Sequence, residues 1–408
     1  MMKSQTIRCT ACNKAGLKSL LSFGNQRPSN QFYSEENKAE NQDSYLLSLG
    51  QCPSCQMVQL VDRMPIEVMR PKFDWLSYNE PEGHLDSSVS ILHSLPGITR
   101  NSQILGLTYK DQSTLDRLSR LGHTYLKCVS TSDLEVNVHP FGLETVQVQL
   151  SKPKVIEGIR EKYGLADLIL VRHILEHSPS AKNLLESISS LVRPGGFIML
   201  ELPDSEKTIR FKNYPFIWEE HFSYFTEHAI KNLASLLGFH IHCLEKYTYA
   251  YEDSLVVILQ TPVVSHHALD AKQYSESVMM SSEFSTFVSQ FNQVAEGWRR
   301  RLKILNDQGE KIAIFGAGHL AVKFLNFYDL AKYIECAIDD HPNKINLSLP
   351  GSGLKIKSSS YLADSGIKYC ISTLSPESEL KVRSKLAKFF ECGGQFLQAF
   401  NTALDKEC

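Results

Sequence analysis

Short runs of apolar residues alternate with longer amphipathic stretches through the middle of the chain. The runs lie at residues 104–107, 167–171, 197–202 and 255–259, and the stretches between them are long enough for helices. Alternating strand-like and helix-like segments are typical of an α/β domain with a largely parallel sheet. We therefore predict such a domain over residues 71–265.

A different periodicity follows this domain. Between residues 263 and 308, large apolar side chains recur at steps of three and four, which predicts one or two long helices. From Lys311, a strand-like run, a Gly-rich turn, a helix and a second strand ending at Asp339 predict another βαβ unit. We expect a helical connector at 266–308 and a second α/β domain at 309–408.

The N-terminal segment has few periodic apolar runs and is rich in turn-forming residues. It holds two Cys-x-x-Cys pairs, formed by Cys9 with Cys12 and by Cys52 with Cys55. Four thiolates complete the tetrahedral shell of a structural Zn²⁺. A redox dithiol is the alternative, but it normally lies in a thioredoxin-like unit that these residues lack. We predict a zinc-binding module at 1–70.

Composition narrows the setting of these domains. The 408 residues carry a net charge of −2, so no overall basic excess favours nucleic acid or an anionic membrane as a partner. The N-terminus has no apolar signal-peptide core, and no run reaches the roughly 18 apolar residues of a membrane span. We expect a cytoplasmic protein whose ordered cysteines serve metal binding or catalysis.

Candidate ligand-binding residues follow the apolar run at 167–171. His173, Glu176 and His177 come directly after this predicted strand, and Arg193-Pro-Gly-Gly forms a tight turn before the next one. Because α/β sheets bind ligands at the carboxyl ends of their strands, we expect these three side chains in a ligand site.

Two other interpretations of this segment are open. His173, Glu176 and His177 spell His-x-x-Glu-His, the inverted zinc-peptidase motif, but that motif needs a continuous helix where only about one turn is available. In a purely structural interpretation, His177 caps a helix that begins near Ser178, and Glu176 faces solvent.

A second candidate segment runs from Trp218 to Phe225 and contains adjacent Glu220 and His221. Making a carbon nucleophile beside a ketone requires removal of a C–H proton, and an imidazole that titrates near neutrality suits that step. The Glu-His pair therefore predicts a base with a supporting carboxylate. An incidental pair in a surface loop is the alternative.

Together these segments resemble the sugar C-methyltransferase family. That family joins an N-terminal zinc domain, a class I S-adenosylmethionine-dependent methyltransferase domain and a C-terminal Rossmann-like domain. The resemblance rests on the paired cysteines, on the Glu-His loop and Arg-Pro-Gly-Gly between two strands, and on Glu-His-x-Ser-Tyr-Phe at 220–225, and it extends over nearly the whole chain. It implies methyl transfer from S-adenosylmethionine to a carbon of a nucleotide-activated keto-deoxysugar, in the making of surface polysaccharide or a glycosylated metabolite.

The resemblance also implies roles for single residues at the sugar site. His221 would act as the base with Glu220 beside it, and Trp218 would stack on the sugar. An aromatic segment at 73–84 resembles a family segment that covers both substrates, although a plain surface loop is the alternative. The further catalytic or substrate-binding candidates are Tyr78, Tyr224 and His84.

The cofactor loop departs from the family pattern. Its first strand should end in Glu-x-Gly-x-x-x-Gly, because only glycine lets the backbone approach the methionine part of the cofactor. Here Gly106, Thr108 and Gln112 stand at those positions, Asp111 alone matches, and the acid expected after the next strand is displaced to Asp133. The cofactor candidates are Gly106, Thr108, Asp111, Asp133, His173, Glu176 and His177. A sugar-nucleotide-binding protein without methyl transfer is the alternative function.

The second α/β domain carries a Gly-rich turn, Gly316-Ala317-Gly318, and Asp339 follows at the end of the next strand. This pattern is close to a dinucleotide fingerprint and leaves open an NAD-dependent sugar-modifying enzyme. The family has a similar turn, followed by Asn-Pro-x-Lys and Pro-Gly segments, in a domain that helps to bind the nucleotide-sugar. The substrate candidates here are Gly316, Gly318, Lys323, Asp339 and Lys344. The resemblance implies a nucleotide-sugar partner, and we make no prediction of the oligomeric state.

Overall fold

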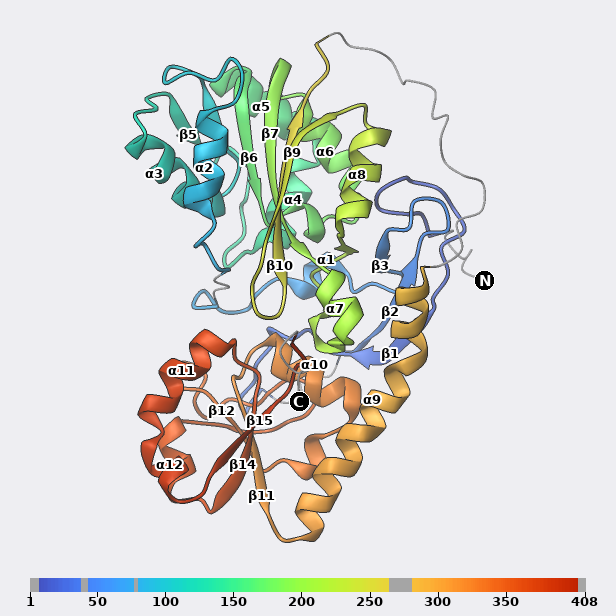
Figure 1. The fold of residues 1–408 in the computed structure, drawn as a ribbon, viewed down its shortest axis with the longest axis vertical. Helices are drawn as coiled ribbons and strands as arrows, with labels where there is room; N and C mark the ends of the chain where they lie inside the picture. The colour runs from blue at the N-terminus through green and yellow to red at the C-terminus, as the bar shows by residue number, and fades with distance from the viewer. Residues whose placement is uncertain (1–6, 38–42, 77–79, 264–280, 403–408) are drawn as a thin grey trace.

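The computed structural model describes residues 7–37, 43–76, 80–263 and 281–402, and three sheets organise them (Figure 1). A small antiparallel sheet lies to one side of two Rossmann-like α/β units, which face each other. The predicted fold class is therefore confirmed, while the exact domain boundaries stay a prediction.

The small sheet has the order β1-β2-β3-β8. Its first three strands come from the predicted zinc-binding module, but β8 comes from the Trp218–Phe225 segment and pairs with β3. The module is thus completed by a strand from the central part of the chain. Its elements are β1 (Leu21–Gln26), β2 (Tyr45–Gln51), β3 (Val58–Leu60), β8 (Ser223–Tyr224) and helix α1 (Ile66–Met69).

The central sheet has the order β5-β4-β6-β7-β10-β9. Its first four strands are parallel, whereas β10 and β9 form an antiparallel hairpin against β7. Its strands are β4 (Ile104–Gly106), β5 (Leu126–Cys128), β6 (Ala166–Arg172), β7 (Val192–Asp204), β9 (His240–Tyr247) and β10 (Asp253–Gln260). Its helices are α2 (Leu85–His93), α3 (Gln112–Arg120), α4 (Leu143–Leu150), α5 (Pro153–Tyr163), α6 (Ala181–Ser189), α7 (Glu206–Phe211) and α8 (Glu227–Leu236).

Strand β6 shows why the apolar runs become central strands. Ile169 and Val171 pack into one core cluster, which includes residues of α4 to α6, and Leu168 and Leu170 pack into another on α2 and α3. A strand buried on both faces reads as a continuous apolar run rather than an alternating one. Its end therefore brings the polar residues that follow it to one edge of a fully covered sheet.

The Arg193-Pro-Gly-Gly segment differs from the predicted tight turn. Val192 pairs with Ala166 and Phe197 pairs with Leu168, so the intervening residues bulge out of β7 instead of preceding it. Gly195 takes a positive φ of 78° within this bulge, a conformation that favours glycine.

The third sheet has the order β13-β12-β11-β14-β15, with every pairing parallel. The predicted βαβ unit is present as β11, α10 and β12, and the predicted connector contains the long helix α9. The elements are α9 (Ser282–Asp307), β11 (Lys311–Phe315), α10 (His319–Tyr328), β12 (Cys336–Ile338), β13 (Ile356–Lys357), β14 (Ile367–Ser372), α11 (Pro376–Lys385), α12 (Ala387–Glu391) and β15 (Gln395–Gln398). Helix α10 is largely apolar around its circumference, and accordingly it is buried between the two α/β units.

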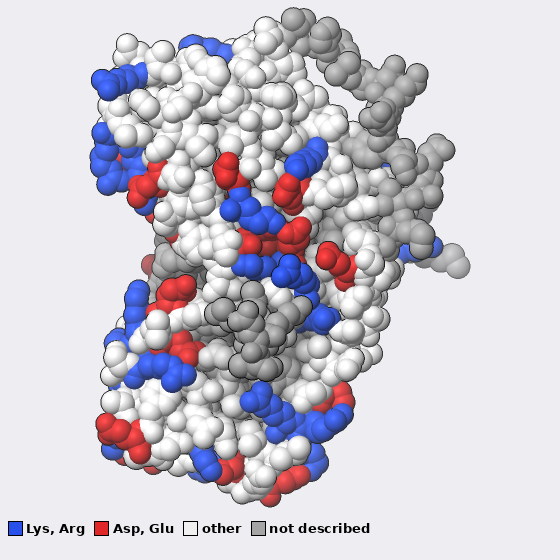
Figure 2. Space-filling view, in the orientation of Figure 1, with Lys and Arg blue, Asp and Glu red and all other residues white. Residues whose placement is uncertain are grey.

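Two surface properties bear on the predicted partners. Within the described ranges, none of the helices has both the length and the apolar character that crossing a bilayer requires. On the face drawn in Figure 2, acidic and basic side chains lie next to one another instead of gathering by sign.

Candidate functional site

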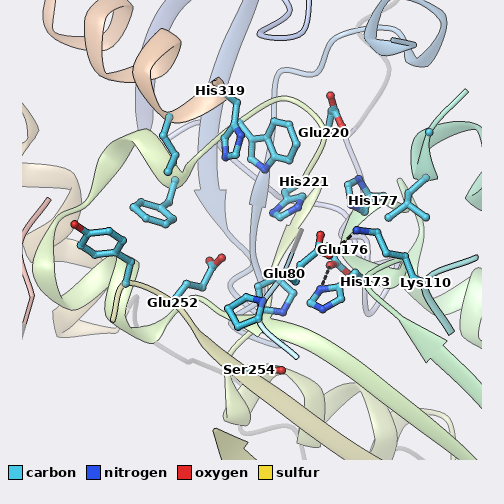
Figure 3. A pocket seen from close by; sticks show the side chains of 18 of the residues that line it. Glu80, Lys110, His173, Glu176, His177, Glu220, His221, Glu252, Ser254 and His319 are labelled. Atoms are coloured by element: carbon cyan, nitrogen blue, oxygen red, sulfur yellow. Dashed lines mark hydrogen bonds and ion pairs between the residues drawn. The ribbon is translucent and has the colours of Figure 1, made fainter. Parts of the chain in front are cut away.

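A cavity of about 700 Å³ lies where the two α/β units meet (Figure 3). The central unit contributes the loops that follow β4 and β6, the end of β7 and the hairpin between β9 and β10. The C-terminal unit contributes the first turns of α10 and α11. The titratable lining residues include Glu80, Lys110, His173, Glu176, His177, Glu201, Glu220, His221, Glu252 and His319.

The loop after β6 brings His173, Glu176 and His177 to the cavity, as predicted. A single 3-10 turn covers Leu175–His177, and α6 starts only at Ala181 with the Ser180 hydroxyl as its cap. The continuous helix of the zinc-peptidase motif is therefore absent. The capping interpretation is also wrong, because Glu176 is only 1% exposed.

The segment around His221 forms the opposite part of the same wall. The His221 and His177 rings lie 4.8 Å apart at 90°, and Trp218 stacks on His319 at 4.3 Å. Burial and the imidazoles of His177 and His319 lower the pKa of His221 well below its usual value. The His221 imidazole is consequently neutral near pH 7, the state that can accept a proton or a metal.

Two predicted partners of His221 have other contacts. Glu220 accepts a hydrogen bond from Asn30 Nδ2 at 3.2 Å, and burial, with the carboxylates Glu144 and Glu219 nearby, raises its pKa well above the usual value. Tyr224 does not line the cavity: its hydroxyl donates to the Trp218 carbonyl at 3.1 Å and accepts from the Trp218 amide at 3.0 Å. Tyr224 therefore shapes the segment rather than facing a substrate.

The zinc-binding module holds this segment in place. The Phe222 amide donates to the Glu176 carbonyl at 2.8 Å, and the Phe222 carbonyl accepts from Leu60 of β3 at 3.0 Å. The Ser223 hydroxyl also donates to Thr10 Oγ1, between Cys9 and Cys12, at 2.8 Å. The two loops of the cavity wall are thus tied to each other and to the cysteine module.

The four predicted cysteines come together as free thiols. The sulfurs of Cys9 and Cys55 are 3.5 Å apart, those of Cys12 and Cys52 are 3.6 Å apart, and all four lie within 4.8 Å of one another. Tetrahedral coordination with Zn–S bonds of about 2.3 Å places sulfurs about 3.8 Å apart. The donor set therefore fits a closed, structural zinc site.

The predicted cofactor loop is a compact turn beneath the cavity. One Asp111 carboxylate oxygen accepts from the amides of Leu107 and Thr108 at 2.9 and 2.8 Å, and the other accepts from the backbone amide of Arg172 at 3.1 Å. Gly106 permits this closure, because a Cβ there would lie 2.8 Å from Asp111 Cβ. Gly106, Thr108 and Asp111 do not line the cavity, whereas Tyr109 and Lys110 of the same turn do.

Asp133 also lies away from the cavity. Its carboxylate binds Lys162 and the Tyr163 hydroxyl, each at 2.6 Å. Tyr78 lies outside the described residues.

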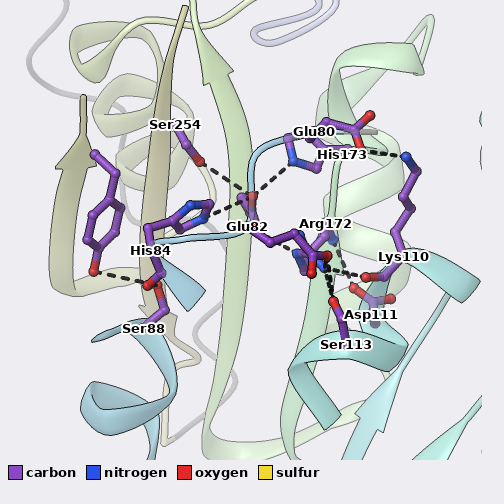
Figure 4. A network of polar contacts seen from close by, with 12 residues as sticks. Glu80, Glu82, His84, Ser88, Lys110, Asp111, Ser113, Arg172, His173 and Ser254 are labelled. Carbon is purple, nitrogen blue, oxygen red and sulfur yellow. Dashed lines mark hydrogen bonds and ion pairs between the residues drawn. The ribbon is translucent and has the colours of Figure 1, made fainter. Parts of the chain in front are cut away.

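A buried network under the cavity joins predicted residues to Arg172 and Glu201, which the sequence did not single out (Figure 4). Glu201 is fully buried and binds Arg172, His173 at 2.9 Å and His84 at 3.0 Å. Burial opposes ionisation of Glu201, but the hydrogen bonds from His173 and His84 and the charge of Arg172 hold its pKa well below the usual value. His84, predicted to bind substrate, instead supports this network from behind the lining.

The prediction that Lys323 binds the substrate is wrong, because Lys323 does not line the cavity. Lys323 is fully buried, and its Nζ lies 2.6 Å from Glu219 Oε2. Its helix α10 is buried around this position, so the ammonium is paired inside the protein.

The other predicted residues of the C-terminal domain also lie outside the lining. Asp339 accepts from the Ala317 amide at 3.0 Å and from Lys344 Nζ at 2.9 Å, so both side chains brace the Gly316–Gly318 turn. The adjacent His319 and Leu320 are the residues of this region that reach the cavity.

Three family models match the chain in series. They are described as "Putative zinc binding domain" at residues 9–69, "Methyltransferase domain" at 101–244 and "C-methyltransferase C-terminal domain" at 260–400. The C-methyltransferase NovU from Streptomyces niveus is 20% identical over 400 residues, which cover 95% of this chain and 94% of that protein.

Solved structures also match part of the chain. An O-methyltransferase family protein from Burkholderia thailandensis is 14% identical, with a TM-score of 0.29, over 43% of this chain and 55% of that one. The 1,6-didemethyltoxoflavin-N1-methyltransferase of the same organism is 15% identical, with a TM-score of 0.30, over 44% of this chain and 79% of that one. The match thus spans little more than half the length of the first of these proteins.

Fold, cavity and family models define a class I methyltransferase flanked by a zinc-binding module and a second Rossmann-like domain. The chain is a methyltransferase that is similar to C-methyltransferases over this three-domain organisation, and S-adenosylmethionine is its cofactor.

S-adenosylmethionine fits the cavity in position, size and charge. The cavity lies at the carboxyl edge of the parallel strands, where α/β sheets bind ligands, and about 700 Å³ is within the usual range of ligand sites. Carboxylates outnumber ammonium groups among the described lining residues, which suits a cofactor with a sulfonium and an ammonium group. The residues that would hold it are Glu80, Tyr109, Lys110 and His173.

Proposed function

We propose that the protein methylates a carbon next to the keto group of a nucleotide-activated deoxysugar. The observation that carries this proposal is the shared cavity, in which the loop after β6 and the Glu220–His221 segment meet above the central sheet. Methylation of such a carbon needs a methyl donor, an acceptor pocket and a proton acceptor within one enclosed space. S-adenosylmethionine supplies the methyl group through its sulfonium.

The two walls divide the binding of donor and acceptor. Tyr109, Lys110 and His173 lie over the ends of β4 and β6 and would hold the methionine part of the cofactor. Trp218, stacked on His319, offers an aromatic surface of the kind that packs against a sugar ring. The first turns of α10 and α11 would face the nucleotide, because they close the cavity from the C-terminal side.

Two lining groups on different elements are suited to take the proton. His221 is the base expected from the sequence, and its imidazole is neutral near pH 7. The structure adds Glu252, in the hairpin between β9 and β10: burial, together with the charge of Glu176, raises its pKa to about 8. A carboxylate with a pKa near the working pH is an efficient general base.

Methyl transfer to a panel of nucleotide keto-sugars tests the proposal. We expect the wild type to form a C-methylated sugar and S-adenosylhomocysteine with at least one member of the panel. We expect His221→Ala to lose about 10²- to 10⁴-fold in rate, the usual contribution of a general acid–base or equally central group. A folded wild-type protein that binds a sugar nucleotide and turns over no cofactor would instead support binding without methyl transfer.

A further inference from the structure

Three metal-ligating side chains meet in the cavity wall, apart from the cysteine site. Glu176 and His177 come from the loop after β6, and His221 comes from the segment before β8. One ligand atom of each lies within 4.8 Å of the others. Two imidazoles and a carboxylate make up a frequent donor set of catalytic zinc and non-haem iron sites.

Two of these three side chains each have a possible metal-ligand atom that makes no hydrogen bond to the described residues. Glu176 Oε2 and His177 Nδ1 are buried and have no hydrogen-bond partner among the described residues. Glu176 is 1% exposed and His177 is 5% exposed. A buried polar atom without a partner destabilises the fold, so a ligand that bonds both atoms would remove that cost.

The remaining atoms of the same side chains are already oriented. Glu176 Oε1 lies 3.5 Å from His173 Nδ1, which leaves Oε2 as the oxygen without a partner. His177 Nδ1 likewise has no hydrogen-bond partner among the described residues, and the His177 and His221 rings lie 4.8 Å apart.

The two loops are also fixed relative to each other before any ion binds. The Phe222 amide donates to the Glu176 carbonyl at 2.8 Å and so links the residue after His221 to the carboxylate ligand. The carboxylate and the two imidazoles therefore come from loops whose relative position is set by the fold itself.

We propose that Glu176, His177 and His221 bind a divalent transition-metal ion that leaves at least one coordination position open to the cavity. The ion is of the Zn²⁺, Fe²⁺ or Co²⁺ class, because imidazole and carboxylate suit these ions. It is distinct from the structural zinc of the four cysteines.

The use of this ion rests on the proposed function, whereas its binding does not. The keto oxygen of the acceptor would occupy the open position, where a cation stabilises the negative charge that develops on that oxygen. The proton on the adjacent carbon passes to Glu252, because His221 serves as a ligand. That carbon then bonds to the methyl group while the S–CH₃ bond breaks, and S-adenosylhomocysteine leaves.

Titration of the full-length protein with Co²⁺ tests the site. The protein is first loaded with one zinc per chain, and binding is followed by calorimetry and absorption. We expect one further Co²⁺ per chain without thiolate-to-metal bands. Glu176→Gln and His177→Asn should weaken it at least tenfold, whereas His319→Asn, in the same cavity but outside the three ligands, should not.

The possible results separate this site from the proposed function. A folded wild type that takes up no second ion overturns the site, as do thiolate bands or equal affinity in all variants. Zinc content and thermal melting identify a misfolded His177→Asn, in which case the nearly isosteric Glu176→Gln decides. Binding without methyl transfer leaves the site standing and contradicts the proposed function, whereas methyl transfer by a wild type free of the second ion overturns the catalytic use of the site.

Discussion

The two Rossmann-like units line the same cavity, but they contribute different sets of titratable side chains to it. The central sheet contributes Lys110, His173, Glu176 and His177 from the loops after its parallel strands. The C-terminal sheet contributes the first turns of two helices, with His319 as the imidazole among its described lining residues. Yet the C-terminal sheet carries the Gly-x-Gly fingerprint, and the central one has lost most of its glycines.

The contrast follows from how the turn after the first strand of each unit, β4 or β11, is closed. In both turns, a carboxylate accepts hydrogen bonds from the turn amides, Asp111 in the central unit and Asp339 in the C-terminal unit. Both turns are therefore closed by their own chain, and the reacting groups come from neighbouring loops. The loops at the sheet edge, more than a glycine pattern, therefore mark the cavity wall that carries the titratable side chains.

The largest expected effect comes from removing the zinc of the cysteine module, which supports the cavity wall around His177 and His221. Cys52→Ser should lose the metal and, because β3 pairs with β8, should also lose methyl transfer. Metal content and activity measure both effects. The exposed Cys392→Ser is the control and should keep both. A zinc-free Cys52→Ser with wild-type activity would show that the wall stands without the module.

A second prediction compares carboxylates on the two sides of the cavity. Glu252→Gln should lower methyl transfer by about 10²- to 10⁴-fold if Glu252 is the base. A base must be ionised, so kcat/KM should rise with pH through about 8 and level off above it. Glu377→Gln changes a lining carboxylate of the C-terminal side and should leave the pH profile unchanged. The same profile in wild type and Glu252→Gln would contradict the assignment.

A third prediction concerns the buried ion pair that joins the two units. Lys323→Met leaves the Glu219 charge unpaired and should destabilise the fold by about 3–5 kcal/mol, measured by urea unfolding. Lys332→Met breaks an exposed pair with Asp329 and should cost about 0–1 kcal/mol. Adding Glu219→Gln to Lys323→Met should recover part of the loss. Equal stability of the two lysine variants would mean that the pair does not join the units.

The smallest expected effect is a null result at the C-terminal turn. Since the Asp339 carboxylate already bonds Ala317 and Lys344, millimolar NAD should give no thermal shift. A clear shift that Asp339→Ala removes would instead show a second nucleotide site.

The sequence was sufficient for features that depend on local pattern. The apolar run of β6, the cysteine spacing and the Glu-His pair are each contained in a few consecutive residues, and the structure brings their side chains to a sheet edge, a cysteine cluster and a cavity. The Arg172–Glu201 network was missed because each partner lies on a different strand and only the sheet register brings them together.

Lys323 was misplaced because lysine is usually exposed, but the sequence did hold a signal. It is the lysine of an otherwise largely apolar helix, His319–Tyr328, which is typical of a buried and paired charge. Glu252 had no comparable signal, since a hairpin residue becomes a cavity residue only through the folding of β9 and β10 onto β7.

Calorimetric titration of the zinc-loaded protein with S-adenosylhomocysteine tests cofactor binding directly, because Thr108 and Gln112 stand where the family pattern of the cofactor loop has glycines. We expect one site per chain with a micromolar Kd, about 8 kcal/mol of binding free energy. Absence of binding in a folded sample that still binds a sugar nucleotide would contradict it.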